Sequence, residues 1–141
     1  MLRLTEAALL AMHTMVYLAG NPDRRVSTRE IATEFDASEA HLSKVLQRLA
    51  RYGLVKSERG PKGGFSLNTH YGGEITLLDI YESIEGPLVE RKCFHTTRIC
   101  DENQCLFGNL LGNINKQVRE YLSATRLPGP AGLIGGVNGR N

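Results

Sequence analysis

The chain has 141 residues, 41% of them hydrophobic and 23% charged, and a formal net charge of +2. This length allows one domain with an appended arm, and so small a net charge does not by itself indicate a nucleic-acid partner. No run reaches the roughly 18 apolar residues of a membrane span, and no secretory cleavage pattern follows the apolar start. We therefore expect a cytoplasmic protein without membrane association, in which thiols stay reduced.

Helical spacing of apolar residues predicts a first helix over residues 5 to 19, which a Gly-Asn-Pro breaker ends. A second helix is expected to begin at Ser27. Ser27 suits the N-cap, and Glu30 stands three residues later, where its side chain can reach back to the cap amide. Val26 and Ile31 flank this cap as a hydrophobic staple.

A third helix is predicted over EAHLSKVLQRLARYG, residues 39 to 53. Its apolar positions fall at i, i+3, i+4 and i+7 and form one buried stripe: Leu42, Val45, Leu46 and Leu49. The opposite face is polar and basic: His41, Lys44, Gln47, Arg48 and Arg51. Together with the short turn at residues 36 to 38, this is the helix-turn-helix pattern, whose second helix fits a major groove about 12 Å wide.

Two extended runs, residues 54 to 58 and 65 to 68, surround the loop Gly60-Pro61-Lys62-Gly63-Gly64 and predict a β-hairpin wing. Positive charge gathers between residues 40 and 64, where Glu58 is the one acid beside these bases: Lys44, Arg48, Arg51, Lys56, Arg59 and Lys62. Such clustering suits phosphate contacts, since each neutralised phosphate releases counterions. The alternatives are a basic face that is only solvated and a loop that is only a turn.

We assign the DNA contacts by position. Residues near the start of the third helix are placed to meet base edges: Ser38, Glu39, Ala40, His41, Ser43 and Lys44. Three basic residues are expected to meet phosphate: Arg48, Arg51 and Lys56. The surface is completed by the start of the second helix and by the wing: Ser27, Thr28, Arg59, Pro61, Lys62 and Gly63.

The rest of the chain divides into four parts by composition. Thr76 and Asp79 cap a fourth helix that ends before Gly86, so residues 1–86 are predicted to be a winged helix-turn-helix domain. A cysteine segment, residues 87–105, follows it. Residues 106–126 carry a heptad-like stripe and are predicted to be a long helix that pairs with a second copy, and the glycine-rich tail 127–141 is expected to be disordered. The fold class is thus mainly α with a small β-hairpin.

All three cysteines, Cys93, Cys100 and Cys105, lie in one polar segment. Their wide spacing contains no CxxC pair of the kind that structural zinc sites use, and it favours soft thiolate ligation of an iron–sulfur cluster over buried, incidental thiols. The fourth ligand stays open among several polar residues of the segment or of a partner subunit: His95, Asp101, Glu102, Glu6 and His13.

The order of these elements, and above all LSKVLQRLARYGLVKSERGPKGGFSL and LLDIYESIEG, resembles the IscR and NsrR family of bacterial winged-helix regulators, the Rrf2 family, over residues 1 to about 125. The resemblance implies a homodimer that binds a palindromic operator in double-stranded DNA. It also implies a cluster, of two-iron or four-iron type, on Cys93, Cys100 and Cys105, base reading by residues 38–44 and a minor-groove contact by Arg59.

Two positions depart from the family's pattern. The IscR-like branch has a histidine three residues after the last cysteine, where this chain has Gly108. The NsrR-like branch has an aspartate near the start of the first helix, where this chain has Leu9. The type of cluster and its signal (oxygen, nitric oxide or iron shortage) therefore stay open.

The sequence predicts a DNA-binding transcription regulator, most often a repressor, whose operator half-sites lie about 34 to 36 Å apart. The alternatives are a metal-free regulator of the same fold that senses through thiols or a partner enzyme, and an electron-transfer protein that does not bind DNA. No enzyme is expected, because the sequence shows neither a nucleophile–histidine–acid arrangement nor a phosphate-binding GxxxxGK[ST] loop.

Overall fold

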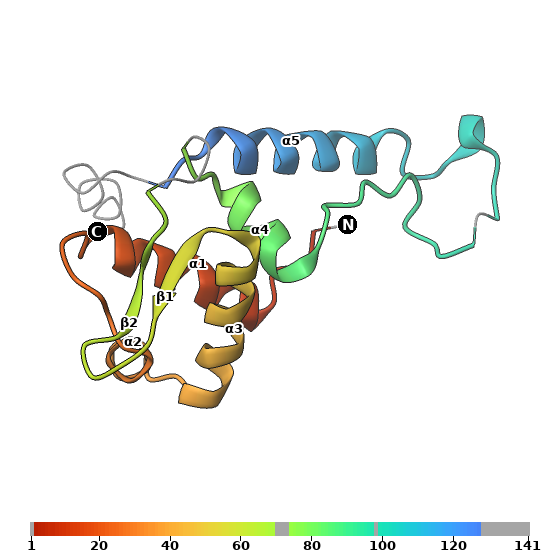
Figure 1. The fold of residues 1–141 in the computed structure, drawn as a ribbon. Coiled ribbons are helices and arrows are strands. Elements are labelled where there is room, and N and C mark those ends of the chain that lie inside the picture. Colours follow the sequence, from red (N-terminus) through yellow and green to blue (C-terminus); the bar gives the residue numbers. More distant parts are fainter. Residues whose placement is uncertain (1, 70–73, 98, 128–141) are drawn as a thin grey trace, which may run out of the picture.

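The structure, a computed structural model, describes residues 2–69, 74–97 and 99–127 (Figure 1). The helices and strands follow in this order: α1 (Glu6–Ala19), α2 (Thr28–Glu34), α3 (Glu39–Tyr52), β1 (Val55–Glu58), β2 (Gly64–Leu67), α4 (Leu77–Glu85), a 3-10 turn (Glu102–Gln104) and α5 (Leu110–Ala124). The predicted fold class, a mainly helical winged helix with a β-hairpin and a long C-terminal helix, is confirmed. None of the described helices is both long enough and apolar enough to cross a membrane.

The main core lies among α1, α3 and α4. The predicted stripe of α3 is confirmed, because Leu42, Leu46 and Leu49 are fully buried and Val45 is 2% exposed. These side chains pack with Met15 and other buried residues of α1 and α4 in one cluster. Burial of a leucine side chain contributes about 1.5 to 3 kcal/mol, so this stripe fixes which face of α3 is left for solvent.

The helix starts follow the predicted capping, with one exception. The Ser27 hydroxyl accepts a hydrogen bond from the Glu30 amide at 3.1 Å, and at α4 the box of Thr76 and Asp79 is complete in both directions. The expected hydrogen bond that the Ser27 amide would donate back to the Glu30 carboxylate does not form, so this part of the prediction is wrong. That carboxylate binds Arg24 and the Tyr17 hydroxyl instead, because tertiary packing brings a guanidinium within reach.

The wing is a two-stranded antiparallel sheet in which Val55 faces Leu67 and Glu58 faces Gly64. Its strands begin one residue away from the predicted bounds. Phe65 also pairs through its backbone with Val26, just before α2, in two hydrogen bonds of 2.9 and 2.8 Å. This bridge joins the wing to the helix-turn-helix.

Helix α5 begins at Leu110 rather than at residue 106. Gly108 adopts a φ of +57°, which interrupts a right-handed helix, and Leu106 and Phe107 therefore lie outside α5 with exposures of 93% and 54%. α5 packs on α4 through a second cluster that contains Tyr81, Leu88 and Leu122. The tail expected to be disordered lies, from residue 128 on, outside the described residues.

Gly64→Ala should lower stability more than Gly60→Ala. Both glycines have positive φ, +149° and +107°, but only at Gly64 would a Cβ meet a neighbour, at 2.7 Å from the Val26 carbonyl oxygen. The clash should add about 1 to 3 kcal/mol to the backbone strain that the variants share. Urea unfolding followed by circular dichroism measures the difference, and equal losses for both variants would contradict the close approach of β2 to Val26.

Candidate nucleic-acid interface and cysteine pocket

The residues predicted to read bases lie at the start of α3. Ser38 is the N-cap, and its hydroxyl accepts a hydrogen bond from the His41 amide at 3.3 Å. The side chains of this group are exposed except for the half-buried Ser43. Figure 1 shows that the start of α3, helix α2 and the wing loop lie at one end of the molecule, while α5 and the cysteine segment lie at the other. The structure thus brings to one end the predicted DNA contacts that α2, the start of α3 and the wing loop carry.

An ion pair between the two helices of the helix-turn-helix was not predicted from the sequence. Arg29 Nε of α2 lies 3.2 Å from Glu39 Oε1 in the first turn of α3. Both side chains are exposed, so the pair adds little stability, about 0 to 1 kcal/mol. It does place a cation of α2 beside the predicted base-reading residues. The signal in the sequence was a basic residue two positions after the Ser27 cap.

Arg48 differs from the other predicted phosphate contacts. Arg48 is exposed, but its Nη1 donates a hydrogen bond of 2.8 Å to the Ile84 carbonyl in the last turn of α4. Arg51, also exposed, lines the same hollow between α3 and α4. Beside them, burial raises the pKa of Tyr52, and the carboxylates of Glu82 and Asp79 on α4 add to the rise. The basic face of α3 is therefore divided: its first half faces solvent, and Arg48 in its second half contacts α4.

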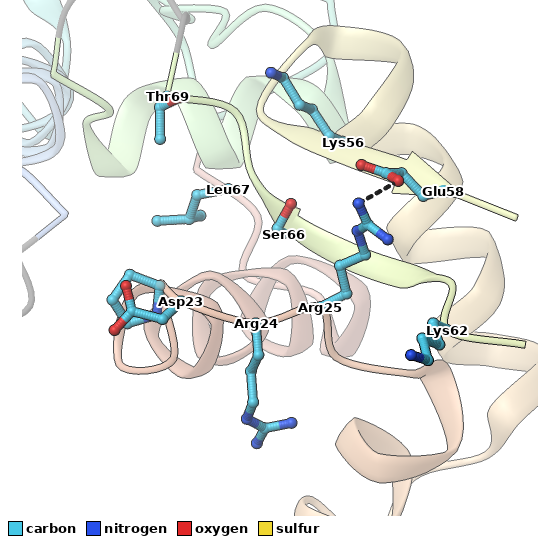
Figure 2. Close-up of a pocket in the computed structure, with 10 residues that line it drawn as sticks. Asp23, Arg24, Arg25, Lys56, Glu58, Lys62, Ser66, Leu67 and Thr69 are labelled. Atoms are coloured by element: carbon cyan, nitrogen blue, oxygen red, sulfur yellow. Dashed lines mark ion pairs between the residues drawn. The ribbon is translucent and has the colours of Figure 1, made fainter.

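At the wing tip the charged side chains of Arg59 and Lys62 are exposed, and so is Pro61. Gly63 is half-buried, and a Cβ there would lie 2.3 Å from the Glu58 carbonyl oxygen. Behind the wing is a hollow of about 510 Å³, shown in Figure 2, where Arg25 Nη2 and Glu58 Oε2 form an ion pair of 2.5 Å. This contact braces the wing against the loop before α2.

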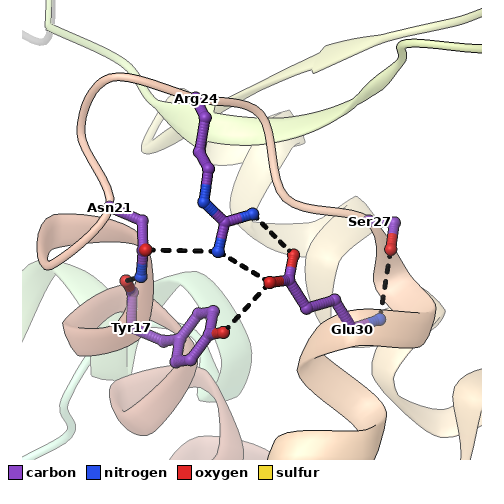
Figure 3. Close-up of polar contacts among 5 residues, drawn as sticks. All are labelled: Tyr17, Asn21, Arg24, Ser27 and Glu30. Atoms are coloured by element: carbon purple, nitrogen blue, oxygen red, sulfur yellow. Dashed lines mark hydrogen bonds and ion pairs between the residues drawn. The ribbon is translucent and has the colours of Figure 1, made fainter.

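A polar cluster holds that loop in place (Figure 3). Arg24 donates two hydrogen bonds to the Glu30 carboxylate, at 2.8 and 2.6 Å, and one of 3.2 Å to Asn21 Oδ1. The Tyr17 hydroxyl donates to Glu30 Oε1 at 3.3 Å. The Arg24 guanidinium lowers the pKa of Glu30, while burial and then the Glu30 charge raise the pKa of Tyr17. The cluster ties α1 to the start of α2, where Ser27 and Thr28 lie.

The three cysteines line one pocket of about 280 Å³. Cys93 and Cys105 are half-buried and Cys100 is exposed, so the interpretation of three core thiols is wrong. The other walls are mainly apolar, and the rings of Phe94 and Phe107 lie 5.0 Å apart between centroids. Among the described residues, no group of three His, Cys, Asp or Glu side chains is arranged to hold a metal ion. The three thiols therefore share a pocket without forming a preset single-ion site.

The candidate fourth ligands lie in different places. His95 lines the cysteine pocket, and its Nδ1 accepts a hydrogen bond of 3.3 Å from the Thr97 amide. Asp101 caps the 3-10 turn. Glu6 lines a hollow beside Ser38 and His41, and His13 packs near the Phe35 ring, so both lie beside the helix-turn-helix of the same chain. Glu102 begins the 3-10 turn, and its side chain lies outside the part of the structure that is described.

An apolar groove of about 800 Å³ runs between the start of the chain and α5. Its walls include Leu4, Leu9 and Tyr121, which are 52%, 41% and 66% exposed. Exposed apolar surface of this kind is typical of a contact between proteins.

The chain matches the Rrf2 family, described as iron-dependent transcriptional regulator, over residues 4–128. It belongs to the Rrf2 family. The family consists of transcriptional regulators, so this chain is a regulator and not an enzyme.

Curated relatives and solved structures agree with this Rrf2 assignment. The HTH-type regulator BadM of Rhodopseudomonas palustris is 40% identical over 87 residues, 60% of this chain and about half, 53%, of BadM. An HTH-type regulator of Aquifex aeolicus is 31% identical over 87% of both chains, and NsrR of Halalkalibacterium halodurans is 29% identical over 86% of this chain and 82% of NsrR. CymR, the global cysteine regulator of B. subtilis, has a TM-score of 0.73 and 28% identity, covering 90% of this chain and 94% of CymR. IscR of T. potens shares the fold, with a TM-score of 0.67 and 23% identity over 89% of this chain and 83% of IscR.

The two departures from the family's pattern have clear positions in this Rrf2 regulator. Gly108 lines the cysteine pocket, so a side chain at that position would lie at the pocket wall. Leu9 lies in the apolar groove instead, where it adds to the exposed hydrophobic surface. Neither residue can supply a ligand through its side chain.

Glu30→Gln should make the Rrf2 regulator less sensitive to acid. The pKa of the Glu30 carboxyl is held below its ordinary value of 4.5 by Arg24, so its ionised form stabilises the fold. That contribution is present above about pH 4.5 and is lost as the pH falls through the lower pKa of the folded state. The fall in Tm between about pH 7 and pH 3 should be smaller in Glu30→Gln than in wild type. Glu34→Gln, on the same helix, is the matched control and should keep the wild-type fall; equal behaviour of all three would contradict the cluster.

Proposed function

We propose that this Rrf2 regulator is a homodimeric repressor that acts in the bacterial cytoplasm on a palindromic operator, and that the state of its cysteine segment sets operator affinity. The observation that carries the proposal is the placement of three thiols in one pocket, at the opposite end of a domain that presents α2, the start of α3 and the wing together. In this proposal the end with α2, the start of α3 and the wing binds the DNA duplex, and the end with the cysteine pocket senses the signal.

Charge and exposure support the DNA contact. The first half of α3 carries the exposed Lys44, and the wing loop carries the exposed Arg59 and Lys62. The start of α3 and the wing loop lie at the same end of the molecule (Figure 1). Phosphate oxygens supply most of the affinity for DNA, and side chains at the start of a groove-binding helix read base edges. The exposed Glu39 and His41 would take that second role, and Arg29 lies beside Glu39.

The apolar groove supports the homodimer. Leu9 of α1 and Tyr121 of α5 line it, and a second copy would cover the same surface in return. Two reading helices related by a twofold axis match an operator with two half-sites.

The cysteine pocket fits an iron–sulfur cluster by donor type. Three thiols that line one pocket with mainly apolar walls are the soft ligands that such clusters take. When bound, a cluster would react with oxygen or nitric oxide, or be lost in iron shortage. Cys93, Cys100 and Cys105 would hold it, and His95 lines the same pocket.

A second candidate, sensing by the thiols themselves, has support of its own. Cys100 is exposed and Cys93 and Cys105 are half-buried, so an oxidant could reach them. Among the described residues no single-ion site is formed, and the similarity to CymR covers 90% of this chain. Both candidates place the signal at the same three sulfur atoms.

Lys44→Gln should weaken binding to any duplex and reduce the slope of log K against log salt by about one unit, because one phosphate contact is lost. Fluorescence anisotropy over a salt series measures the slope. Lys116→Gln removes an exposed charge from α5, at the other end of the molecule, and should leave the slope unchanged. A wild-type slope in Lys44→Gln would remove this part of α3 from the interface.

Protein purified without oxygen should show visible absorbance, with iron and acid-labile sulfide in matched amounts. Cys93→Ser and Cys105→Ser should lose both, because each removes a thiolate from the pocket wall. A colourless wild type that resists reconstitution with ferrous iron and sulfide would exclude the cluster and leave the thiol candidate. Ser123→Ala, a change on α5 away from the pocket, is the control and should keep the iron.

A further inference from the structure

We infer that Arg48 is a positioning residue that couples the cysteine segment to the reading helix, rather than a phosphate contact. This inference rests on the proposed function, since it describes how the state of the cysteines reaches α3. It assigns different tasks to two neighbouring arginines on one helix face, Arg48 and Arg51.

The first contact joins α3 to α4. Arg48 Nη1 donates to the Ile84 carbonyl at 2.8 Å, and Ile84 lies in the last turn of α4. Carbonyls at a helix C-terminus lack intrahelical partners, and a cation there also interacts favourably with the helix dipole. The guanidinium therefore has a reason to remain on α4, and any movement of the end of α4 moves its partner on α3.

The second contact joins α4 to the start of the cysteine segment. Leu88 follows Ile84 by four residues, and its amide donates a hydrogen bond of 2.8 Å to Glu82 Oε2. Leu88 is 7% exposed and packs with Tyr81 of α4 and Leu122 of α5. The segment thus leaves α4 held by both a hydrogen bond and apolar packing.

The third contact joins the same segment to α5, close to the first cysteine. Asn115 Nδ2 donates to the Arg91 carbonyl at 2.8 Å, and Arg119 Nη2 donates to the Leu88 carbonyl at 2.8 Å. Asn115 is only 9% exposed, so losing its bond would leave polar groups unpaired in a buried place. Because Arg91 stands two residues before Cys93, a rearrangement at the sulfur atoms acts on this attachment first.

These contacts make the end of α4 and residues 86–91 one connected element between the pocket and α3. A connected element transmits a signal when both ends bias its position. The cysteines bias it through Arg91, and α3 is tied to it through Arg48. Arg51 offers the matched comparison: it lines the same hollow, but makes no such bond to α4 among the described residues.

The test is the ratio of DNA affinities between two states of the cysteines. A duplex selected by the wild-type protein from a random-sequence library is titrated with anaerobic protein as purified, and again after chelation of iron and alkylation with iodoacetamide. The proteins are wild type, Arg48→Gln, Arg48→Lys, Arg51→Gln and Asn115→Leu. Melting curves check that each variant folds.

We expect a wild-type ratio of about 5 to 150, in either direction. Arg48→Gln and Asn115→Leu should bring it to within about twofold of one, while Arg48→Lys, which keeps a donor, should restore most of it. Arg51→Gln should weaken DNA binding equally in both states, so it should keep the affinity ratio and lower the salt slope by about one unit. Arg48→Gln should keep the wild-type salt slope.

Two results would overturn the inference. If the wild-type ratio differs from one and Arg48→Gln preserves it, the coupling through Arg48 is wrong. If Arg48→Gln loses a unit of salt slope, Arg48 is a phosphate contact rather than a positioning residue. The proposed function then stands. A wild-type ratio of one would overturn the proposed gating and this inference together, and it is visible before any variant is compared.

Discussion

The burial of one face of α3 is the constraint on which the rest of the structure depends. Leu42, Leu46 and Leu49 are fully buried against α1 and α4, so the helix cannot rotate without exposing them. The Ser38 cap begins the helix and Gly53, at a φ of +92°, ends it. With both its rotation and its ends determined, α3 presents its polar residues in a single orientation beside α2 and the wing.

Helix α4 lies between the two halves of the molecule. Ile80 and Ile84 belong to the main core that holds α3. Tyr81 belongs to the second cluster, together with Leu122 of α5 and with Leu88, which lies between the two helices. A helix that contributes to both clusters cannot shift against one without disturbing the other, because close-packed interiors transmit displacement. The end that carries the cysteine pocket and the end that carries the helix-turn-helix are therefore mechanically connected.

Local signals in the sequence predicted what local physics decides. The caps at Ser27 and Thr76 and the stripe on α3 need only neighbours in sequence, and all are confirmed. Contacts made across the fold were not predictable in this way. The Glu30 carboxylate turned to Arg24 instead of its own cap, and periodicity showed that Arg48 lies outside the core without showing that α4 would accept its hydrogen bond. The pairing of Asn115 with the Arg91 carbonyl likewise depends on how α5 packs.

Control of DNA affinity by the cysteines can be measured by comparing two proteins. Wild type and a variant with Cys93, Cys100 and Cys105 all changed to serine are titrated on the same selected duplex, without oxygen and after exposure to air. Air should change the affinity of wild type for the duplex at least about fivefold and leave the affinity of the variant unchanged. An equal response in both proteins, or none in wild type, would contradict it.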